Sequence, residues 1–177
     1  TIDCTRAYKK AKEKRYSFFL YYLHKSLMAA NEVLPFRYRT EEGKVYEYDA
    51  VHASPTIMRS DGTFGFSYMN FHQDFIQFQE EAQVEINRVQ NSQGLFPAVS
   101  GENVIHFSSL PWLDFTSLSH ARSYSFKDSS PKISFGKMTG TSEGKKSMPV
   151  SVHVNHALVD GYHVGQFIDR FQELMNE

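Results

Sequence analysis

The sequence has little cysteine, no long apolar run and no excess of charge of either sign. Its single cysteine, Cys4, excludes an intrachain disulfide and favours a reducing compartment. No apolar stretch approaches the ~18 residues of a membrane span, and no secretory signal is present. We therefore expect a cytoplasmic protein without a membrane partner.

The charges nearly cancel, with 19 basic residues against 20 acidic ones and a formal net charge of -1. Because binding to nucleic acids requires an excess of clustered positive charge, this balance predicts no nucleic-acid partner. The length of 177 residues is enough for one domain with a sizeable core. We expect residues 1–177 to form that single domain.

Aromatic residues are abundant, since 15 Phe and 10 Tyr help to bring the aromatic share to 15%. Such rings are buried in a core, at a subunit interface or around an apolar ligand. Most are expected in the core. Phe96 and Phe126 are also candidates for the lining of an apolar ligand pocket.

Apolar spacing and turn residues predict helices that alternate with strands. The spacing favours helices over 5–31, with a second helix capped by Ser17, over 70–90 and over 164–174. Strand patterns cover 36–40, 45–48, 53–58, 64–68, 104–108, 132–138 and 148–155. This mixture indicates an α+β fold, or two-layer α/β fold, in which helices cover a mixed sheet.

The stretch 151–165 contains the best candidate for catalytic chemistry. Valines alternate with polar residues up to Val154, as in a half-buried strand that we expect to end near His156. An imidazole at this position can accept a proton at neutral pH. Asp160-Gly161 is a turn dipeptide before the last helix. The pattern His-x-x-x-Asp-Gly alone is equally compatible with an ordinary strand, turn and helix.

Three ordered motifs together resemble the chloramphenicol acetyltransferase family. They are Leu110-Pro-Trp-Leu-Asp-Phe-Thr-Ser117, Pro131-Lys-Ile-Ser134-Phe-Gly-Lys137 and His156-Ala-Leu-Val-Asp160-Gly161-Tyr-His-Val-Gly165. Weaker similarity extends from about Asp3 to the C-terminus. The resemblance implies the fold of acyl-coenzyme A-dependent acyltransferases. It also implies acetyl transfer from acetyl-coenzyme A to a hydroxyl of chloramphenicol, and hence antibiotic resistance.

The resemblance assigns roles to the matching residues. His156 would be the general base, and Ser117 would stabilise the tetrahedral oxyanion. Asp160 and Gly161 would support the site, with Asp160 paired to an arginine from a segment that precedes Thr1 in the family. Ser134, at a position where the family has threonine, would lie near the acceptor and contact it through a water molecule.

Two positions depart from the family pattern, and neither is the base. Asn155 replaces the first of two adjacent family histidines, and Val159 replaces a residue that is often cysteine. His153 and His156 are three apart on the expected strand, which would place them on opposite faces. We therefore predict no metal site.

The resemblance further implies a homotrimer with active sites between subunits. The base of one chain would face the serine and most acceptor-binding residues of its neighbour. Two alternatives remain open: an acyltransferase of the same mechanism with another hydroxylated acceptor, and a non-catalytic trimeric binding protein. The dihydrolipoyl transacetylase core also has His-x-x-x-Asp-Gly, but Pro111-Trp112 and the absence of a lipoyl domain disfavour it.

Overall fold

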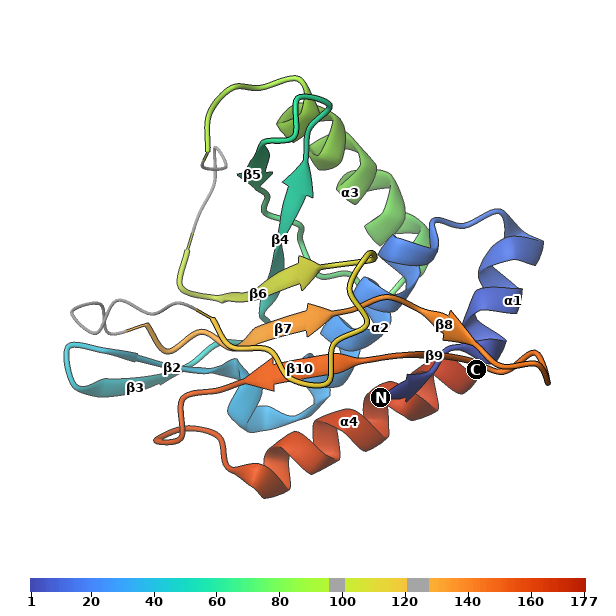
Figure 1. Ribbon diagram of the computed structural model, residues 1–177. Coiled ribbons are helices and arrows are strands. Elements are labelled where there is room, and N and C mark those ends of the chain that lie inside the picture. Colours follow the sequence, from blue (N-terminus) through green and yellow to red (C-terminus); the bar gives the residue numbers. More distant parts are fainter. Residues whose placement is uncertain (96–100, 121–127) are drawn as a thin grey trace.

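The centre of the computed structural model is a five-stranded mixed sheet with the strand order β10-β7-β6-β4-β5 (Figure 1). The structure describes residues 1–95, 101–120 and 128–177. Strands β4 (His52–Met58), β6 (Val104–Ser109) and β7 (Lys132–Phe135) are parallel. The two flanking strands, β5 (Phe64–Phe66) and β10 (Val150–His153), are antiparallel to their neighbours.

Smaller strands extend from this sheet on both sides. The hairpin of β2 (Tyr38–Glu41) and β3 (Lys44–Glu47) turns through Glu42 and Gly43, which have φ values of 49° and 77°. A second small sheet joins β1 (Ile2–Asp3), β9 (Lys146–Met148) and β8 (Thr139–Gly140). The first hairpin lies where strand patterns were expected over 36–40 and 45–48, although its first strand begins only at Tyr38.

The apolar face of the central sheet packs against two helices, α2 (Phe18–Glu32) and α4 (Gly161–Asn176). On this face, the ring of Phe135 lies 4.8 Å from that of Tyr22 on α2 and 6.1 Å from that of Phe171 on α4. Ile105, Ile133 and Phe135 are almost completely buried. The core of the molecule therefore lies between this face and the two helices.

The opposite face of the sheet is polar. Residues that pair directly across neighbouring strands share a face. The registers bring Ser54, His106, Lys132 and His153 into one row across β4, β6, β7 and β10. The next positions of β6, β7 and β10 carry serines, with Ser134 paired to both of its neighbours. The segment after β6 turns back across the sheet in this region (Figure 1).

The remaining helices are α1 (Thr5–Lys14), the short 3-10 helix η1 (Leu34–Arg37) and α3 (Phe75–Gln90). As expected, α2 begins after Ser17, whose side chain accepts a hydrogen bond from the amide of Leu20 at 3.4 Å. Helix α3 begins at Phe75 rather than near residue 70, because the Asp74 carboxylate accepts from the amide of Gln77 at 2.9 Å and caps it. Among the described ranges, no helix is both long and apolar enough to cross a membrane.

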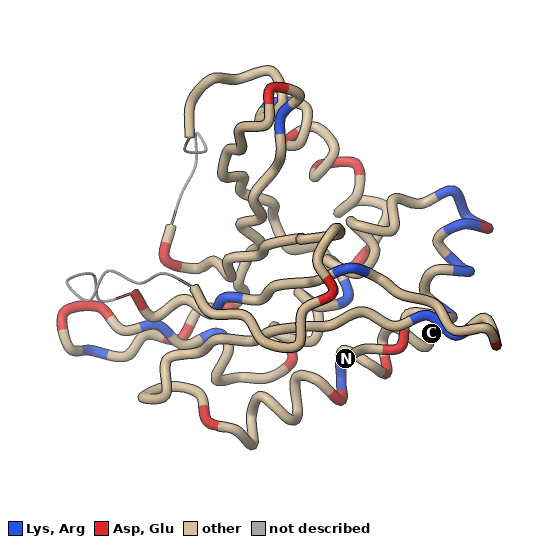
Figure 2. Tube along the Cα trace, in the orientation of Figure 1, with Lys and Arg blue, Asp and Glu red and all other residues tan. Residues whose placement is uncertain are grey.

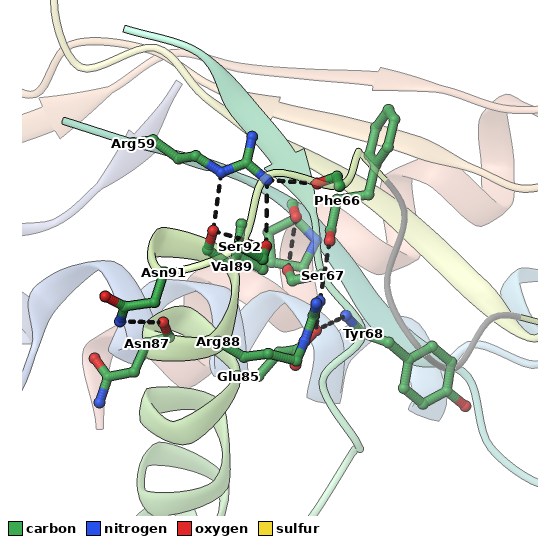
Figure 3. A network of polar contacts seen from close by, with 12 residues as sticks. Arg59, Phe66, Ser67, Tyr68, Glu85, Asn87, Arg88, Val89, Asn91 and Ser92 are labelled. Carbon is green, nitrogen blue, oxygen red and sulfur yellow. Dashed lines mark hydrogen bonds and ion pairs between the residues drawn. The ribbon is translucent and has the colours of Figure 1, made fainter. Parts of the chain in front are cut away.

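Buried arginine side chains anchor the corner of β4, β5 and α3 (Figure 3). The guanidinium of Arg59 donates to the carbonyls of Val89, Phe64 and Gly94 at 2.9, 2.7 and 2.5 Å. These bonds tie the last turn of α3, at Val89, to β5, at Phe64, and to the segment after the helix, at Gly94. Gly65 is required here, because a Cβ at this position would lie 2.5 Å from Nη2 of Arg59.

Several expected strands are shorter than predicted, for example β5, which ends at Phe66 rather than at residue 68. Residues 148–155 divide into β9 and β10 at Pro149, which has no amide hydrogen for a sheet. Strand β10 ends at His153, so His156 follows the strand within a turn. The strand expected over 132–138 ends at Phe135, and β8 begins only at Thr139.

Candidate active site

His156 lies in the turn between β10 and α4, and its side chain is exposed. Nδ1 of its ring is 3.4 Å from the carbonyl oxygen of Val159. A proton on Nδ1 that points to this carbonyl would leave Nε2 free to accept another proton. The turn therefore offers one nitrogen of His156 to a ligand.

Asn155 organises this turn. Its side-chain oxygen accepts from the amide of Ala157 at 3.0 Å, and its carbonyl accepts from the amides of Leu158 and Val159 at 2.9 and 3.0 Å. Asparagine is well suited to such turns because its short side chain reaches the backbone two residues later. The departure from the family pattern at this position thus has a local structural role.

Asp160 caps helix α4 and so fixes the far end of the histidine turn. Its Oδ1 accepts from the amides of Tyr162 and His163 at 2.9 and 3.2 Å. No arginine of the described residues contacts Asp160, and its Oδ1 lies 3.1 Å from Nδ1 of His163. Gly161 is the first residue of α4 rather than part of a turn, and a Cβ there would meet nothing within 4 Å.

A cavity of about 370 Å³ lies beside His156 and is lined mainly by residues with polar or charged side chains; we call it the polar cavity. Both His153 and His156 line it, so the expectation that they lie on opposite faces is wrong. The reason is that β10 ends at His153, and the turn brings His156 to the same side. In the part of the chain that the structure describes, no three His, Cys, Asp or Glu side chains are arranged to hold a metal ion.

Ser134 lies beneath this cavity and does not line it. Its side chain is fully buried, and its Oγ is 3.2 Å from Nε2 of His120. His120 lines the cavity instead. The other two residues considered as acceptor contacts, Phe96 and Phe126, lie outside the described residues.

Sequence reasoning missed His120 and the ion pair between Asp128 and Lys132, which all line the polar cavity. Burial lowers the pKa of His120, and its neighbours His153 and Lys132 lower it further. Burial raises the pKa of Asp128, but bonds from Lys132 and Ser130 outweigh this and leave it below its ordinary value. The alternation of polar and apolar residues along β6 and β7 was the sequence signal that could have revealed this polar face.

A second cavity, of about 660 Å³, lies at the other end of these strands and has largely apolar walls. Its lining includes Phe18, Tyr22, Met58, Trp112, Lys137 and Met138. The hydroxyl of Tyr22 shares a 2.8 Å hydrogen bond with Ser109, and burial raises the pKa of Tyr22 to about 12. Tyr22 therefore stays uncharged.

Ser117 belongs to the segment that follows β6, and it is exposed. The segment is anchored to the end of β7, because the amide of Leu110 donates to Phe135 at 2.8 Å and the amide of Lys137 donates to Leu113 at 2.7 Å. Within one chain, the two expected catalytic residues, Ser117 and His156, are not joined by a hydrogen bond among the described residues.

Solved structures with this architecture define its fold class. A dihydrolipoamide acetyltransferase from Azotobacter vinelandii superposes on this chain with a TM-score of 0.72. The match covers 99% of this chain and 79% of the other, and at 15% identity it shows a shared fold alone. A solved chloramphenicol acetyltransferase has a TM-score of 0.87 and 28% identity over 98% of this chain and 85% of its own. The chain therefore has the acyltransferase fold, as the sequence predicted.

The family follows from the sequence comparisons. A family model described as chloramphenicol acetyltransferase matches residues 1–172. A chloramphenicol acetyltransferase from Bacillus pumilus is 30% identical over 176 residues, which are 98% of this chain and 80% of the relative. Chloramphenicol acetyltransferase 3 from Escherichia coli is 30% identical over 179 residues, with 99% and 83% covered. The chain belongs to the chloramphenicol acetyltransferase family, which confirms the resemblance.

Proposed function

We propose that this chain transfers the acetyl group of acetyl-coenzyme A to a hydroxyl of chloramphenicol and so inactivates the antibiotic. Family membership and the names of its relatives support the reaction and the acceptor. One structural observation carries the proposal. The segment 109–120 begins on the apolar cavity, at Ser109 and Trp112, and reaches the polar cavity of His156 at His120. Ser117 lies between these points in the chain.

The apolar cavity suits the donor. Its volume of about 660 Å³ and its aromatic walls fit an extended pantetheine arm. Lysines and arginines gather along the adjoining α1 (Figure 2). The ammonium groups of Lys12 and Lys146 lie 5.3 and 4.9 Å from the ring centre of Tyr8, which contacts the cavity residue Phe18 at 5.2 Å. Cations at this position complement the phosphates of coenzyme A.

The polar cavity suits the acceptor and its activation. Nε2 of His156 takes the proton from the acceptor hydroxyl while its oxygen attacks the thioester carbonyl. The hydroxyl of Ser117, which a neighbouring chain would supply in the trimer proposed below, donates to the tetrahedral oxyanion as its charge develops. When the intermediate collapses, the carbon–sulfur bond breaks, and the imidazolium of His156 returns its proton to the leaving thiolate.

We propose that the active enzyme is a homotrimer with sites between subunits. The exposure of Ser117, without a hydrogen bond to His156 in the described part of one chain, supports this, because a neighbouring chain would complete the site. We place the enzyme in the cytoplasm, where acetyl-coenzyme A is available.

The test is to incubate the purified protein with acetyl-coenzyme A and chloramphenicol and to follow thiol release. His156→Ala should lower kcat by ~10²–10⁴-fold, the usual contribution of a positioned base. Ser117→Ala should lower it by ~10²–10³-fold. His72→Ala is the matched control, because this histidine pairs with Glu81 outside both cavities. Absence of thiol release by the wild type would overturn the proposal.

A further inference from the structure

His120 and Lys132 line two cavities at once. One is the polar cavity of about 370 Å³ beside His156. The other, of about 260 Å³, lies over the polar face of the sheet, where Ser54, His106 and Ser108 also line it. The side chains of His120 and Lys132 therefore form a wall that both cavities share.

His120 is held in this wall from two sides. Its Nε2 lies 3.2 Å from Oγ of Ser134, which is fully buried below it. Its ring meets that of His153 edge to face, with the centres 4.9 Å apart and an interplanar angle of 82°. A ring with two such contacts is fixed in orientation, and no described residue bonds to its Nδ1. One nitrogen of His120 thus remains for a molecule in the cavity.

Lys132 is engaged within the wall. Its ammonium group pairs with the carboxylate of Asp128 and lies 3.5 Å from the carbonyl of Ser130. Because the opposite charges compensate each other, this pair offers little attraction to a charged ligand. His120 is therefore the member of the shared wall with hydrogen-bonding capacity to spare.

We propose that His120 determines acceptor specificity, by offering Nδ1 to a polar group of the acceptor, and that Ser134 positions His120 from below. This inference rests on the proposed acetyl transfer to chloramphenicol. It assigns to the imidazole of His120, which covers Ser134, the acceptor contact that was expected of Ser134. A site built to hydrogen-bond its ligand rejects molecules that leave its polar groups unpaired.

Two substitutions of His120 separate hydrogen bonding from shape. His120→Leu keeps an apolar side chain of similar reach but removes the nitrogen atoms, whereas His120→Gln keeps an amide that can bond. His120→Leu should raise both the Kd and the KM for chloramphenicol by roughly five- to tenfold, the effect of one buried hydrogen bond. His120→Gln should stay within about threefold of the wild type. For both variants, kcat and the KM for acetyl-coenzyme A should change less than about twofold.

Ser134→Ala tests whether Ser134 positions His120, because Ser134 contacts His120 but does not line the cavity. It should raise the KM for chloramphenicol by about threefold in the wild type and should add little to His120→Leu, because both changes disrupt one unit. Ser67→Ala is the matched control. Ser67 is also fully buried, and its hydroxyl donates to the carbonyl of Pro55 at 2.7 Å away from His120. Urea unfolding should show similar stability losses for the two serine variants, whereas only Ser134→Ala should alter the KM.

The Kd is measured by calorimetry with chloramphenicol in the absence of acetyl-coenzyme A, and the kinetic constants by thiol release. Unchanged Kd and KM in His120→Leu, in a wild type that acetylates chloramphenicol, would overturn this inference and leave the proposed function intact. Binding that weakens in His120→Leu without any thiol release by the wild type would retain His120 as a contact and overturn the proposed function. Neither binding nor thiol release would overturn both.

Discussion

At the scale of single residues, the turn that presents His156 depends on its neighbour Asn155. The asparagine side chain accepts from the amide of Ala157, and among the described residues the histidine ring has one long hydrogen-bond contact, 3.4 Å to the carbonyl of Val159. The orientation of the proposed base is therefore set more by the backbone of the turn than by its own hydrogen bond.

Asn155→Ala should consequently lower kcat while it leaves the KM for acetyl-coenzyme A unchanged. We expect the free energy of unfolding to fall by about 0.5–1.5 kcal/mol, the usual effect of one lost hydrogen bond. Steady-state kinetics and urea unfolding give the two quantities. Asn155→Asp serves as the control, since it keeps an oxygen for the amide of Ala157, and it should retain most of the activity. Equal kcat values for the wild type and Asn155→Ala would contradict this role.

A second residue, His24 on α2, should make stability depend on pH. Its side chain is almost completely buried, Nδ1 has no partner among the described residues, and Nε2 lies 2.9 Å from the carbonyl of His72. Burial lowers the pKa of His24 to about 4. Because the unfolded chain has a pKa near ~6.5 here, it binds the proton first as pH falls, and stability present above pH 6.5 is lost toward pH 4.

We expect the His24 contribution to fall by about 2 kcal/mol between pH 7 and pH 5. The measurement is urea unfolding of the wild type and His24→Leu at both values. Other histidines with lowered pKa values, such as His106 and His120, act in the same direction in both proteins. The loss on acidification should therefore be smaller in His24→Leu, and identical losses would refute the assignment.

The sequence located some residues of the candidate site but not their surroundings. Alternating valines placed His156 near the end of a strand, since such patterns are local, although β10 ends three residues earlier, at His153. Ser134 was expected to face the acceptor, yet it lies beneath His120. That contact joins residues 14 apart across the segment between two strands, so no local period reveals it. The polar row on the sheet depends on strand order, which spacing alone does not give.

At the scale of elements, the segment that carries Ser117 is fixed to β7 by close packing at Gly136. A Cβ at Gly136 would lie 2.7 Å from the carbonyl of Leu113, 2.9 Å from the ring of Phe115 and 2.6 Å from the ring of Pro149. Backbone carbonyls cannot move away as a flexible side-chain tip can. This glycine thus sets how closely the two segments approach.

Gly136→Ala should push the segment outward and displace Ser117. We expect a loss of about 1–3 kcal/mol in the free energy of unfolding, as for other overpacked sites, together with a lower kcat. Gly140→Ala is the matched control, because a Cβ there would meet its nearest atom at an ordinary 3.7 Å. Urea unfolding and thiol-release kinetics compare the two variants. Equal free energies of unfolding and equal kcat values for Gly136→Ala and Gly140→Ala would contradict a role for this close approach.

Elements were predictable where a cap or turn residue marks them. Ser17 marked the start of α2, and Gly43 marked the β2–β3 hairpin. Errors arose where two signals overlapped. The alternation over 148–155 continues through Pro149, although proline ends the hydrogen bonding there. Likewise Asp160-Gly161 has the composition of a turn, but the aspartate caps α4.

At the scale of the whole molecule, sites between subunits predict complementation between inactive variants. If His156 of one chain acts with Ser117 of its neighbour, a mixed trimer of His156→Ala and Ser117→Ala chains contains some intact sites. Random assembly of equal amounts should restore about a quarter of the sites. The two variants are unfolded together, refolded, and compared with separately refolded samples for thiol release.

The same experiment distinguishes the alternative arrangement. If both residues act within one chain, no mixture of the two variants contains an intact site, and activity stays at the level of the separate variants. Light scattering on each sample checks the assembly. A stable and active monomer would contradict the proposed trimer.

The two faces of the central sheet give neighbouring positions of one strand different freedom to change during evolution. On β7, Ile133 and Phe135 form the core, whereas Lys132 and Ser134 belong to the polar side with the cavities. Substitutions at the second pair change the hydrogen bonds and charges of the cavity side, whereas substitutions at the first pair change the apolar packing of the core. Acceptor binding can therefore change through substitutions on the polar face of β7 while Ile133 and Phe135 keep the apolar core unchanged.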